Sequence, residues 1–272
     1  MAKKQKTKVG RKGKLAATKK GQAPKGSQSD SKAKRKPAFD VLRGSAIVLM
    51  VIDHVAHALD YLIEPTNIRI VTRLSMPLFA ILMGYFLVKS QRTNYLRLLQ
   101  LGIAAVFMSW VTTRAFGQAE ILAALFCSAI IFHLTKPIFP IFVVAAFIFA
   151  FDPTNAGSGL EWLPITFDYP LTICLSCVAL GAVVARCHAV IAIIAAALVA
   201  AAGWIVPPPS AYVLIASLPA TALLVIASNY GAISIWRSKF ATWLGFCGRY
   251  PLSIYIVHYV AVIIAIEMMP TK

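Results

Sequence analysis

Long apolar segments separated by short polar connections occupy most of the chain after residue 40. Nine such segments can be counted, at approximately 41–61, 68–88, 96–113, 119–135, 138–151, 170–186, 189–206, 211–228 and 250–268. A helix of about twenty mainly apolar residues is long enough to cross a bilayer, and most of these segments approach that length. The pattern predicts an all-α, polytopic transmembrane helical bundle with about nine spans, in a range of eight to ten.

The composition agrees with this class and separates a tail from the body. The chain of 272 residues is 59% hydrophobic and only 14% charged, whereas about 25% of the residues of a soluble domain are charged. Fourteen of its 27 Lys and Arg residues lie in the first 36 positions. Residues 1–37 cannot bury a core, so we expect a disordered Lys-rich cytoplasmic tail there and a membrane domain at 38–272. Two roles stay open for the tail: fixing topology while contacting anionic lipid, or binding nucleic acid or another acidic partner.

The charges of the connections predict the orientation of the bundle. Basic residues fill alternate connections, and acidic residues such as Glu64, Asp152 and Glu161 fill the others. Because cytoplasmic loops of membrane proteins are enriched in Lys and Arg, this alternation places the N-terminus in the cytoplasm.

Four ionisable side chains interrupt the first apolar segment: Asp53, His54, His57 and Asp60. In a helix, the first and third of these lie on one face, and so do the third and fourth. Ionisable groups at membrane depth are costly and usually face a protein interior or a water-filled cavity. The sequence therefore predicts an internal polar site in the outer half of this helix.

Two arginines open the second apolar segment. Arg69 and Arg73 are four residues apart, so they share a helix face. Their depth suits an ion pair with Asp53 or Asp60. One interpretation is an ion pair that only locks the first two helices together. The other is a catalytic set, in which His54 is the general base and Asp53 and Arg73 orient and charge it; His57, Asp60 and Arg69 then belong to the substrate pocket.

The last apolar segment carries a further polar group, Tyr255 and His258. These side chains either line the same cavity as His54 or pack as satisfied groups inside the bundle, and the sequence does not decide between the two. Four basic residues near the predicted cytoplasmic side form a collar: Arg43, Lys89, Arg92 and Arg97. Ordinary positive-inside bias explains this collar, and so does docking of a phosphate-rich cofactor such as coenzyme A. We expect no metal site.

Three stretches carry a family resemblance. The run FDVLRGSAIVLMVIDHVAHAL resembles the first helix of membrane-bound acyltransferases, which place Leu-Arg-Gly before an apolar helix that contains a histidine. The run IRIVTRLSMPLFAILMGYFLVKSQRTNYLRLL resembles the TraX family, through Arg73, Pro77, Phe79, Gly84, Tyr95 and Arg97. The closing GRYPLSIYIVHYV is similar to the last helix of that family.

The resemblance implies an acetyl-CoA-dependent membrane acyltransferase of a bacterial inner membrane. TraX-family proteins are associated with conjugative pili and with N-terminal acetylation of pilin, so the resemblance implies a pilin amine as acceptor. The sequence itself leaves pilin peptide, glycan and lipid open as acceptors. Two other functions remain open from the residues alone. One is a proton-coupled transporter or exporter that uses an Asp-His-Arg relay, and the other is a non-catalytic assembly protein for a pilus or secretion system.

Overall fold

The fold is entirely helical in the part of the chain that the structure, a computed structural model, describes. This part comprises residues 36–60, 71–90, 95–116, 119–151, 169–208, 210–231, 236 and 238–268. Its helices are α1 (Pro37–Asp60), α3 (Ser75–Lys89), α4 (Tyr95–Phe116), α5 (Ile121–Thr135), η1 (Lys136–Ile138), α6 (Phe139–Ala150), α7 (Leu171–Arg186), α8 (Ala189–Ala202), α9 (Ser210–Tyr230), α10 (Lys239–Cys247) and α11 (Pro251–Glu267). They belong to one compact unit that begins at Lys36. The predicted tail lies outside the described residues apart from its last two positions.

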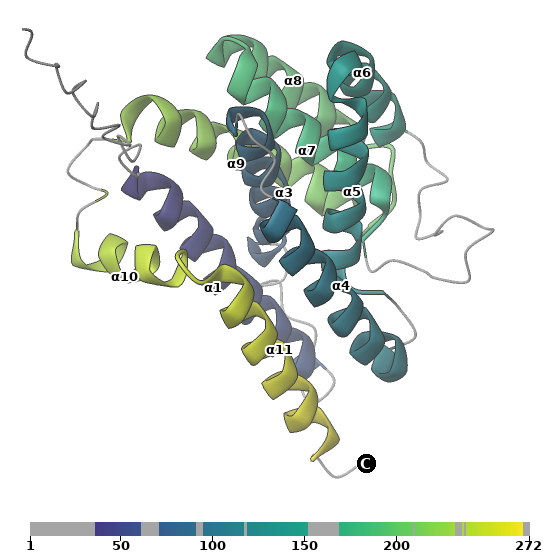
Figure 1. The fold of residues 1–272 in the computed structure, drawn as a ribbon, viewed down its shortest axis with the longest axis vertical. Coiled ribbons are helices and arrows are strands. Elements are labelled where there is room, and N and C mark those ends of the chain that lie inside the picture. The colour runs from purple at the N-terminus through teal and green to yellow at the C-terminus, as the bar shows by residue number, and fades with distance from the viewer. Residues whose placement is uncertain are drawn as a thin grey trace, which may run out of the picture. The chain divides into compact units, whose positions relative to one another are not determined.

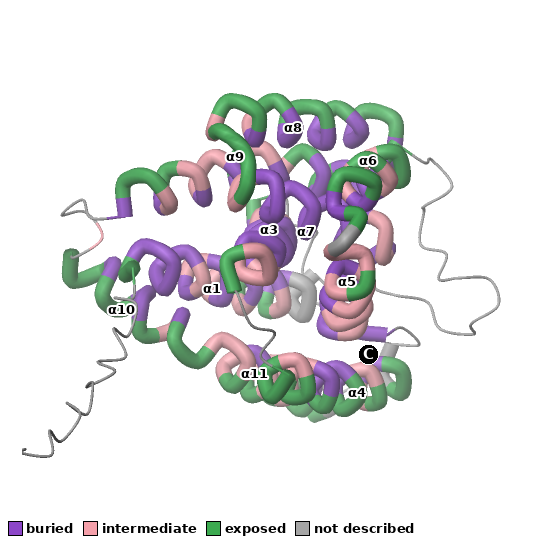
Figure 2. The backbone as a smooth tube through the Cα atoms, turned by 45° about the horizontal axis from the view of Figure 1, so that its top comes forward, coloured by how far each residue is buried: buried purple, intermediate pink, exposed green. Residues whose placement is uncertain are grey.

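Helices α3 and α7 form the centre of the bundle. Both are buried along most of their length, and Figure 2 shows them in purple between more exposed neighbours. Their backbones meet at Gly84 and Gly181, where an added Cβ would overlap the carbonyl of Val178 or Ile81. Small residues allow such close approach between helices in membranes. Helices α1, α5 and α9 pack against α3, and helices α5, α6, α8 and α9 pack against α7.

Helix α1 lies beside α3, α10 and α11, and Figure 1 shows α11 running next to it. Glycines make the crossing of α1 and α10 possible. A Cβ at Gly44 would overlap the carbonyl of Leu244, and a Cβ at Gly248 would overlap the carbonyl of Asp40. Gly44 of the Leu-Arg-Gly stretch and Gly248 of the closing GRYPLSIYIVHYV run therefore face one another at the same helix crossing.

A sharp bend joins α10 to α11. The Ser238 side chain caps α10 by accepting a hydrogen bond from the Ala241 backbone amide at 3.1 Å. The helix ends at Cys247, and α11 begins at Pro251, because proline suits the first turn of a helix. The two axes differ by 79°. This bend turns α11 so that it runs along α1.

The predicted nine spans are not confirmed. Among the described residues, two helices are long and apolar enough to cross a membrane, Tyr95–Arg114 and Ser210–Tyr230, and the bent pair α10 and α11 could form a third span. Five other apolar helices have only 12 to 16 residues. At 1.5 Å per residue they measure about 18 to 24 Å, which is less than the roughly 30 Å hydrocarbon core of a bilayer. The chain nevertheless has the apolar helices of a membrane protein.

Candidate functional site

Two histidines that are 204 residues apart in the sequence meet between α1 and α11. His54 Nδ1 lies 2.9 Å from His258 Nε2, which is a hydrogen-bond distance. The two rings are almost parallel, with an interplanar angle of 13° and centroids 5.1 Å apart. The structure therefore brings the His258 ring into contact with His54.

A backbone carbonyl fixes the tautomers of this histidine pair. His258 Nδ1 lies 2.8 Å from the carbonyl oxygen of Ile254, which can only accept a hydrogen bond. His258 therefore carries its proton on Nδ1, and in its neutral form its Nε2 accepts. His54 Nδ1 must then be the donor in the contact between the rings. It follows that Nε2 of neutral His54 holds the lone pair that a general base needs.

Two tyrosines of α11 stand beside the histidine pair. The Tyr259 ring packs edge-on to His54 with centroids 4.6 Å apart, and the Tyr255 ring lies 6.4 Å from His54 and 5.5 Å from His258. Tyr255 is only 2% exposed. Its hydroxyl has no hydrogen-bond partner among the residues that the structure describes. The histidine pair thus lies beside a buried hydroxyl that has no hydrogen-bond partner among the described residues.

Asp53 links α1 to the segment that leads into α3. Its carboxylate accepts a hydrogen bond of 2.6 Å from the Thr72 hydroxyl, and both residues are buried. Sequence reasoning missed Thr72, because a threonine in an apolar segment carries no signal of its own. The role predicted for Asp53, orienting His54, stays a prediction.

Arg73 follows Thr72 directly, so the structure brings Asp53 and Arg73 to the same region. The Arg73 guanidinium donates a hydrogen bond to the hydroxyl of Tyr169 and lies 5.3 Å from the centre of its ring. Tyr169 precedes α7 and is buried. It was not predicted from the sequence, in which only Pro170 marks the start of the next helix. The arginine therefore ties the segment before α3 to the segment before α7.

Four of the predicted site residues cannot be placed in the site. His57 and Asp60 belong to the last turns of α1, but their side chains are not among those described. Arg69 and Arg92 lie outside the described residues. Within the described residues, no group of three His, Cys, Asp or Glu side chains could hold a metal ion.

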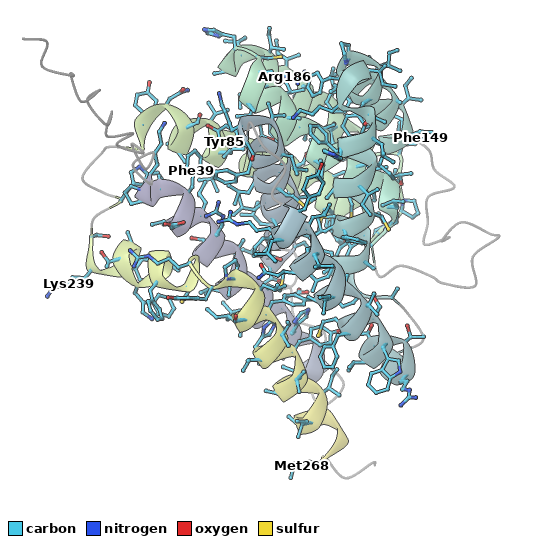
Figure 3. The ribbon with its side chains drawn as sticks, viewed as in Figure 1. Phe39, Tyr85, Phe149, Arg186, Lys239 and Met268 are labelled. Carbon is cyan, nitrogen blue, oxygen red and sulfur yellow. The ribbon has the colours of Figure 1, made fainter. Side chains whose placement is uncertain are left out.

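The predicted basic collar forms in part, at the end of the bundle where α1 begins and α3 ends. Arg43 pairs with Asp40 at 2.8 Å and stacks on Phe86 at 4.4 Å. Lys89 lies 5.9 Å from the centre of the Tyr85 ring, and Figure 3 labels Tyr85 beside Phe39 at this end. Arg97 is exposed in the first turn of α4. Lys89 and Arg97 are thus exposed cations, whereas Arg43 is half-buried and its charge is paired with that of Asp40.

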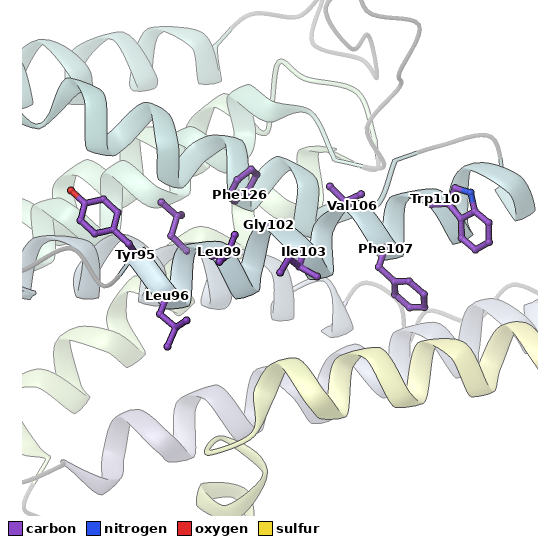
Figure 4. Close-up of a pocket in the computed structure, with 10 residues that line it drawn as sticks. Tyr95, Leu96, Leu99, Gly102, Ile103, Val106, Phe107, Trp110 and Phe126 are labelled. Carbon is purple, nitrogen blue, oxygen red and sulfur yellow. The ribbon is translucent and has the colours of Figure 1, made fainter.

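An apolar groove of about 1080 Å³ runs along the outside of α4. Figure 4 shows its lining, from Tyr95 and Leu99 to Trp110 on α4, with Phe126 of α5 behind Gly102. Arg114 stacks on Trp110 at 4.2 Å at one end, and Arg97 follows Tyr95 at the other. An aromatic ring and a cation at each end of an apolar stretch are typical of a helix that faces lipid.

One family comparison matches part of the chain. The model of a family described as an acyltransferase domain matches residues 36–114, less than a third of the chain. The match supports an acyltransferase family. It covers α1, α3 and most of α4, and so includes Asp53, His54 and Arg73, whereas His258 lies outside it. Comparison with curated proteins and with solved structures gives no significant match. The match does not distinguish the TraX family.

Proposed function

We propose that the chain is an integral membrane acyltransferase that moves an acyl group, preferably acetyl, from acetyl-CoA to an amine or hydroxyl acceptor. The observation that carries the proposal is the hydrogen-bond chain from the Ile254 carbonyl through His258 to His54. With these tautomers, Nε2 of neutral His54 is a hydrogen-bond acceptor. His54 belongs to the segment matched by the acyltransferase family.

In the proposed reaction, His54 is the general base. The acceptor N–H or O–H gives its proton to His54 Nε2 while the acceptor atom bonds to the thioester carbonyl carbon. The tetrahedral intermediate then breaks its C–S bond, and the leaving thiolate takes the proton from His54. Throughout, His258 accepts the hydrogen bond from His54 Nδ1. It therefore holds the ring in the required tautomer and stabilises the charged imidazolium.

Coenzyme A docks, in this proposal, at the basic collar. Lys89 and Arg97 are the exposed cations of the collar that would bind its phosphates, whereas the charge of Arg43 is already paired with that of Asp40. His54 lies eleven residues beyond Arg43, which is about 16 Å along α1. The flexible pantetheine arm would bridge this separation and deliver the thioester to the histidines. The collar would then lie on the cytoplasmic side, where acetyl-CoA is made.

The proposed acceptor reaches the histidines from the other side of the membrane. A pilin N-terminus follows from the resemblance to the TraX family, and a glycan hydroxyl satisfies the same chemistry. A bacterial inner membrane with the N-terminus in the cytoplasm agrees with the distribution of basic connections in the sequence.

The proposal is tested with His54→Ala. Membranes that contain wild-type or variant protein receive acetyl-CoA labelled in the acetyl group, and label in lipid, glycan and protein is measured separately. We expect transfer to fall about 100-fold or more, because a positioned general base contributes about 10²- to 10⁴-fold. His188→Ala is the matched control, since His188 is exposed between α7 and α8 and should not affect transfer.

Two results would contradict the proposal. Transfer by His54→Ala at the wild-type rate removes the histidine from the reaction. If wild-type protein consumes no acetyl-CoA but moves protons or a solute when a gradient is applied, the polar site belongs to a transporter. Identification of the labelled product in the wild-type membranes also names the acceptor.

A further inference from the structure

The Tyr255 hydroxyl is a buried polar group that the proposed reaction has not yet used. The side chain is 2% exposed, and no residue in the described parts of the chain lies within hydrogen-bond distance of its oxygen. Burying a hydroxyl without a partner costs about 1–3 kcal/mol. Such a group calls for a physical reason, and a ligand that accepts its hydrogen bond is one.

The other unpartnered hydroxyls of the described residues have a simpler explanation. They are on Ser109 and Ser217, which lie inside helices, and on Thr172, in the first turn of α7. A serine or threonine hydroxyl is one short rotatable bond from the backbone and can turn to a nearby carbonyl, as Thr221 does with Ser217 at 2.8 Å. A tyrosine hydroxyl is held at the far end of a rigid ring and cannot reach its own backbone. The hydroxyl of Tyr255 therefore needs a partner from elsewhere.

The position of Tyr255 indicates what that partner is. Residues 255, 258 and 259 share one face of α11, because they are three or four positions apart. The Tyr255 ring stacks on Tyr259 with centroids 5.9 Å apart and lies edge-on to His54 at 6.4 Å. A group that gives its proton to His54 is therefore bound next to the Tyr255 side chain.

We propose that Tyr255 donates a hydrogen bond to the oxyanion that forms from the acyl carbonyl during transfer. This inference rests on the proposed acyltransferase function. When the acceptor atom bonds to the thioester carbon, the π electrons of the C=O bond move to the oxygen, and the acceptor proton goes to His54. The Tyr255 O–H binds that negative oxygen and keeps its own proton. The C=O bond then re-forms as the C–S bond breaks. A donor aimed at charge that develops only in the transition state lowers the barrier directly.

Tyr255→Phe separates this role from a structural one, because a structural role predicts a loss of thermal stability, whereas the oxyanion role predicts a loss of kcat. The variant removes one oxygen atom and leaves the ring packing on Tyr259 and the histidines in place. Loss of a buried hydroxyl without a partner leaves thermal stability unchanged or raises it. Loss of an oxyanion donor lowers kcat by about 100- to 1000-fold, with little change in the KM for the acyl thioester.

The experiment measures kcat and KM for labelled acetyl-CoA, together with thermal unfolding in detergent, on full-length protein. Tyr250→Phe makes the same chemical change at an exposed position just before α11 and should retain wild-type values. The expected result for Tyr255→Phe is a large loss of kcat in a protein that is at least as stable as the wild type.

Three outcomes overturn the inference. A wild-type kcat in Tyr255→Phe shows that the hydroxyl does not act, while the acyltransferase function stands. A raised KM with an unchanged kcat shows that the hydroxyl only binds the substrate ground state. Absence of transfer by the wild-type protein contradicts the proposed function itself, and the oxyanion role falls with it.

Discussion

His258 acts on its neighbour through a contact with its own helix. The Ile254 carbonyl holds the proton of His258 on Nδ1, and the ring then presents Nε2 to His54 at 2.9 Å. In many enzymes a carboxylate gives a catalytic histidine its tautomer and orientation. Here a neutral ring and a backbone carbonyl have the right geometry for that task. The charge of Asp53 is thus not required to explain the tautomer of His54.

Two substitutions of His258 test this positioning role. His258→Gln keeps an oxygen near the place of Nε2 that can accept from His54, whereas His258→Leu keeps the volume and removes the acceptor. We expect the leucine variant to lose transfer about 100-fold or more, approaching the loss of the base itself. The glutamine variant should keep most of the activity.

The measurement is kcat with labelled acetyl-CoA for both variants, together with thermal unfolding. Equal loss in the glutamine and leucine variants, or equal retention, would exclude the acceptor role of His258. A purely structural role would make the loss of activity follow the loss of stability.

At the scale of single residues, the sequence indicated that some polar residues lie in one region, but it did not indicate their hydrogen-bond partners. The helical spacing of the first segment and the two arginines indicated a polar site at one depth, and the structure brings Asp53, Thr72 and Arg73 together there. The partners Thr72 and Tyr169 carried no signal, since ordinary hydroxyls in apolar surroundings are common. The contact of His54 with His258 depends on the bend before α11, which a single sequence does not reveal.

Close backbone contact fixes the helices that carry the site. The crossing of α1 and α10 at Gly44 and Gly248 holds the start of α11 against α1, and the crossing at Gly84 and Gly181 holds the buried pair α3 and α7. Several connecting helices are too short to cross a bilayer alone. Hydropathy identified these apolar segments, but it did not distinguish a full span from a shorter helix buried among others.

Alanine substitutions in α10 test the crossing. Gly248→Ala places a Cβ onto the Asp40 carbonyl, so the helices must separate, and we expect a loss of about 1–3 kcal/mol of unfolding free energy together with reduced transfer. Gly245→Ala is the matched control, because its Cβ would meet only Val41 Cγ2 at 3.8 Å, an ordinary contact.

Thermal unfolding in detergent and transfer activity are measured for both alanine variants. Equal stability of the two variants would contradict the close approach at Gly248. If Gly248→Ala loses stability but keeps full activity, the crossing stabilises the fold without determining the geometry of the histidine pair.

For the whole molecule, the compact unit that begins at Lys36 contains the histidines, the collar and the groove. The composition of the chain predicted an all-α membrane protein and a change in character near residue 37, because charge and apolar content differ so strongly there. The number of spans did not follow from composition. It depends on which apolar helices are covered by protein and which by lipid.

Deletion of residues 1–35 tests whether this unit is sufficient for chemistry. Lys36 should remain, because its ammonium donates a hydrogen bond of 3.1 Å to the Ser228 carbonyl. We expect the shortened protein to transfer acetyl to a small soluble amine or alcohol at a rate close to that of the full chain. Transfer to the natural acceptor, or binding to anionic vesicles, is measured alongside to find what the tail adds. If the shortened protein no longer transfers acetyl to the small acceptor, the tail is required for the chemical reaction itself.

The pairing of α1 with α11 also sets the moment at which the protein can first react during its synthesis. His54 is translated 204 residues before His258, and ribosomes add about 5–20 residues per second, so the interval is about 10–40 s. For that time the early helices are in place without the ring that, in the proposed mechanism, sets the tautomer of the base. A nascent chain held on the ribosome before α11 emerges should therefore leave acetyl-CoA intact, and activity should begin only when the closing helix joins the first.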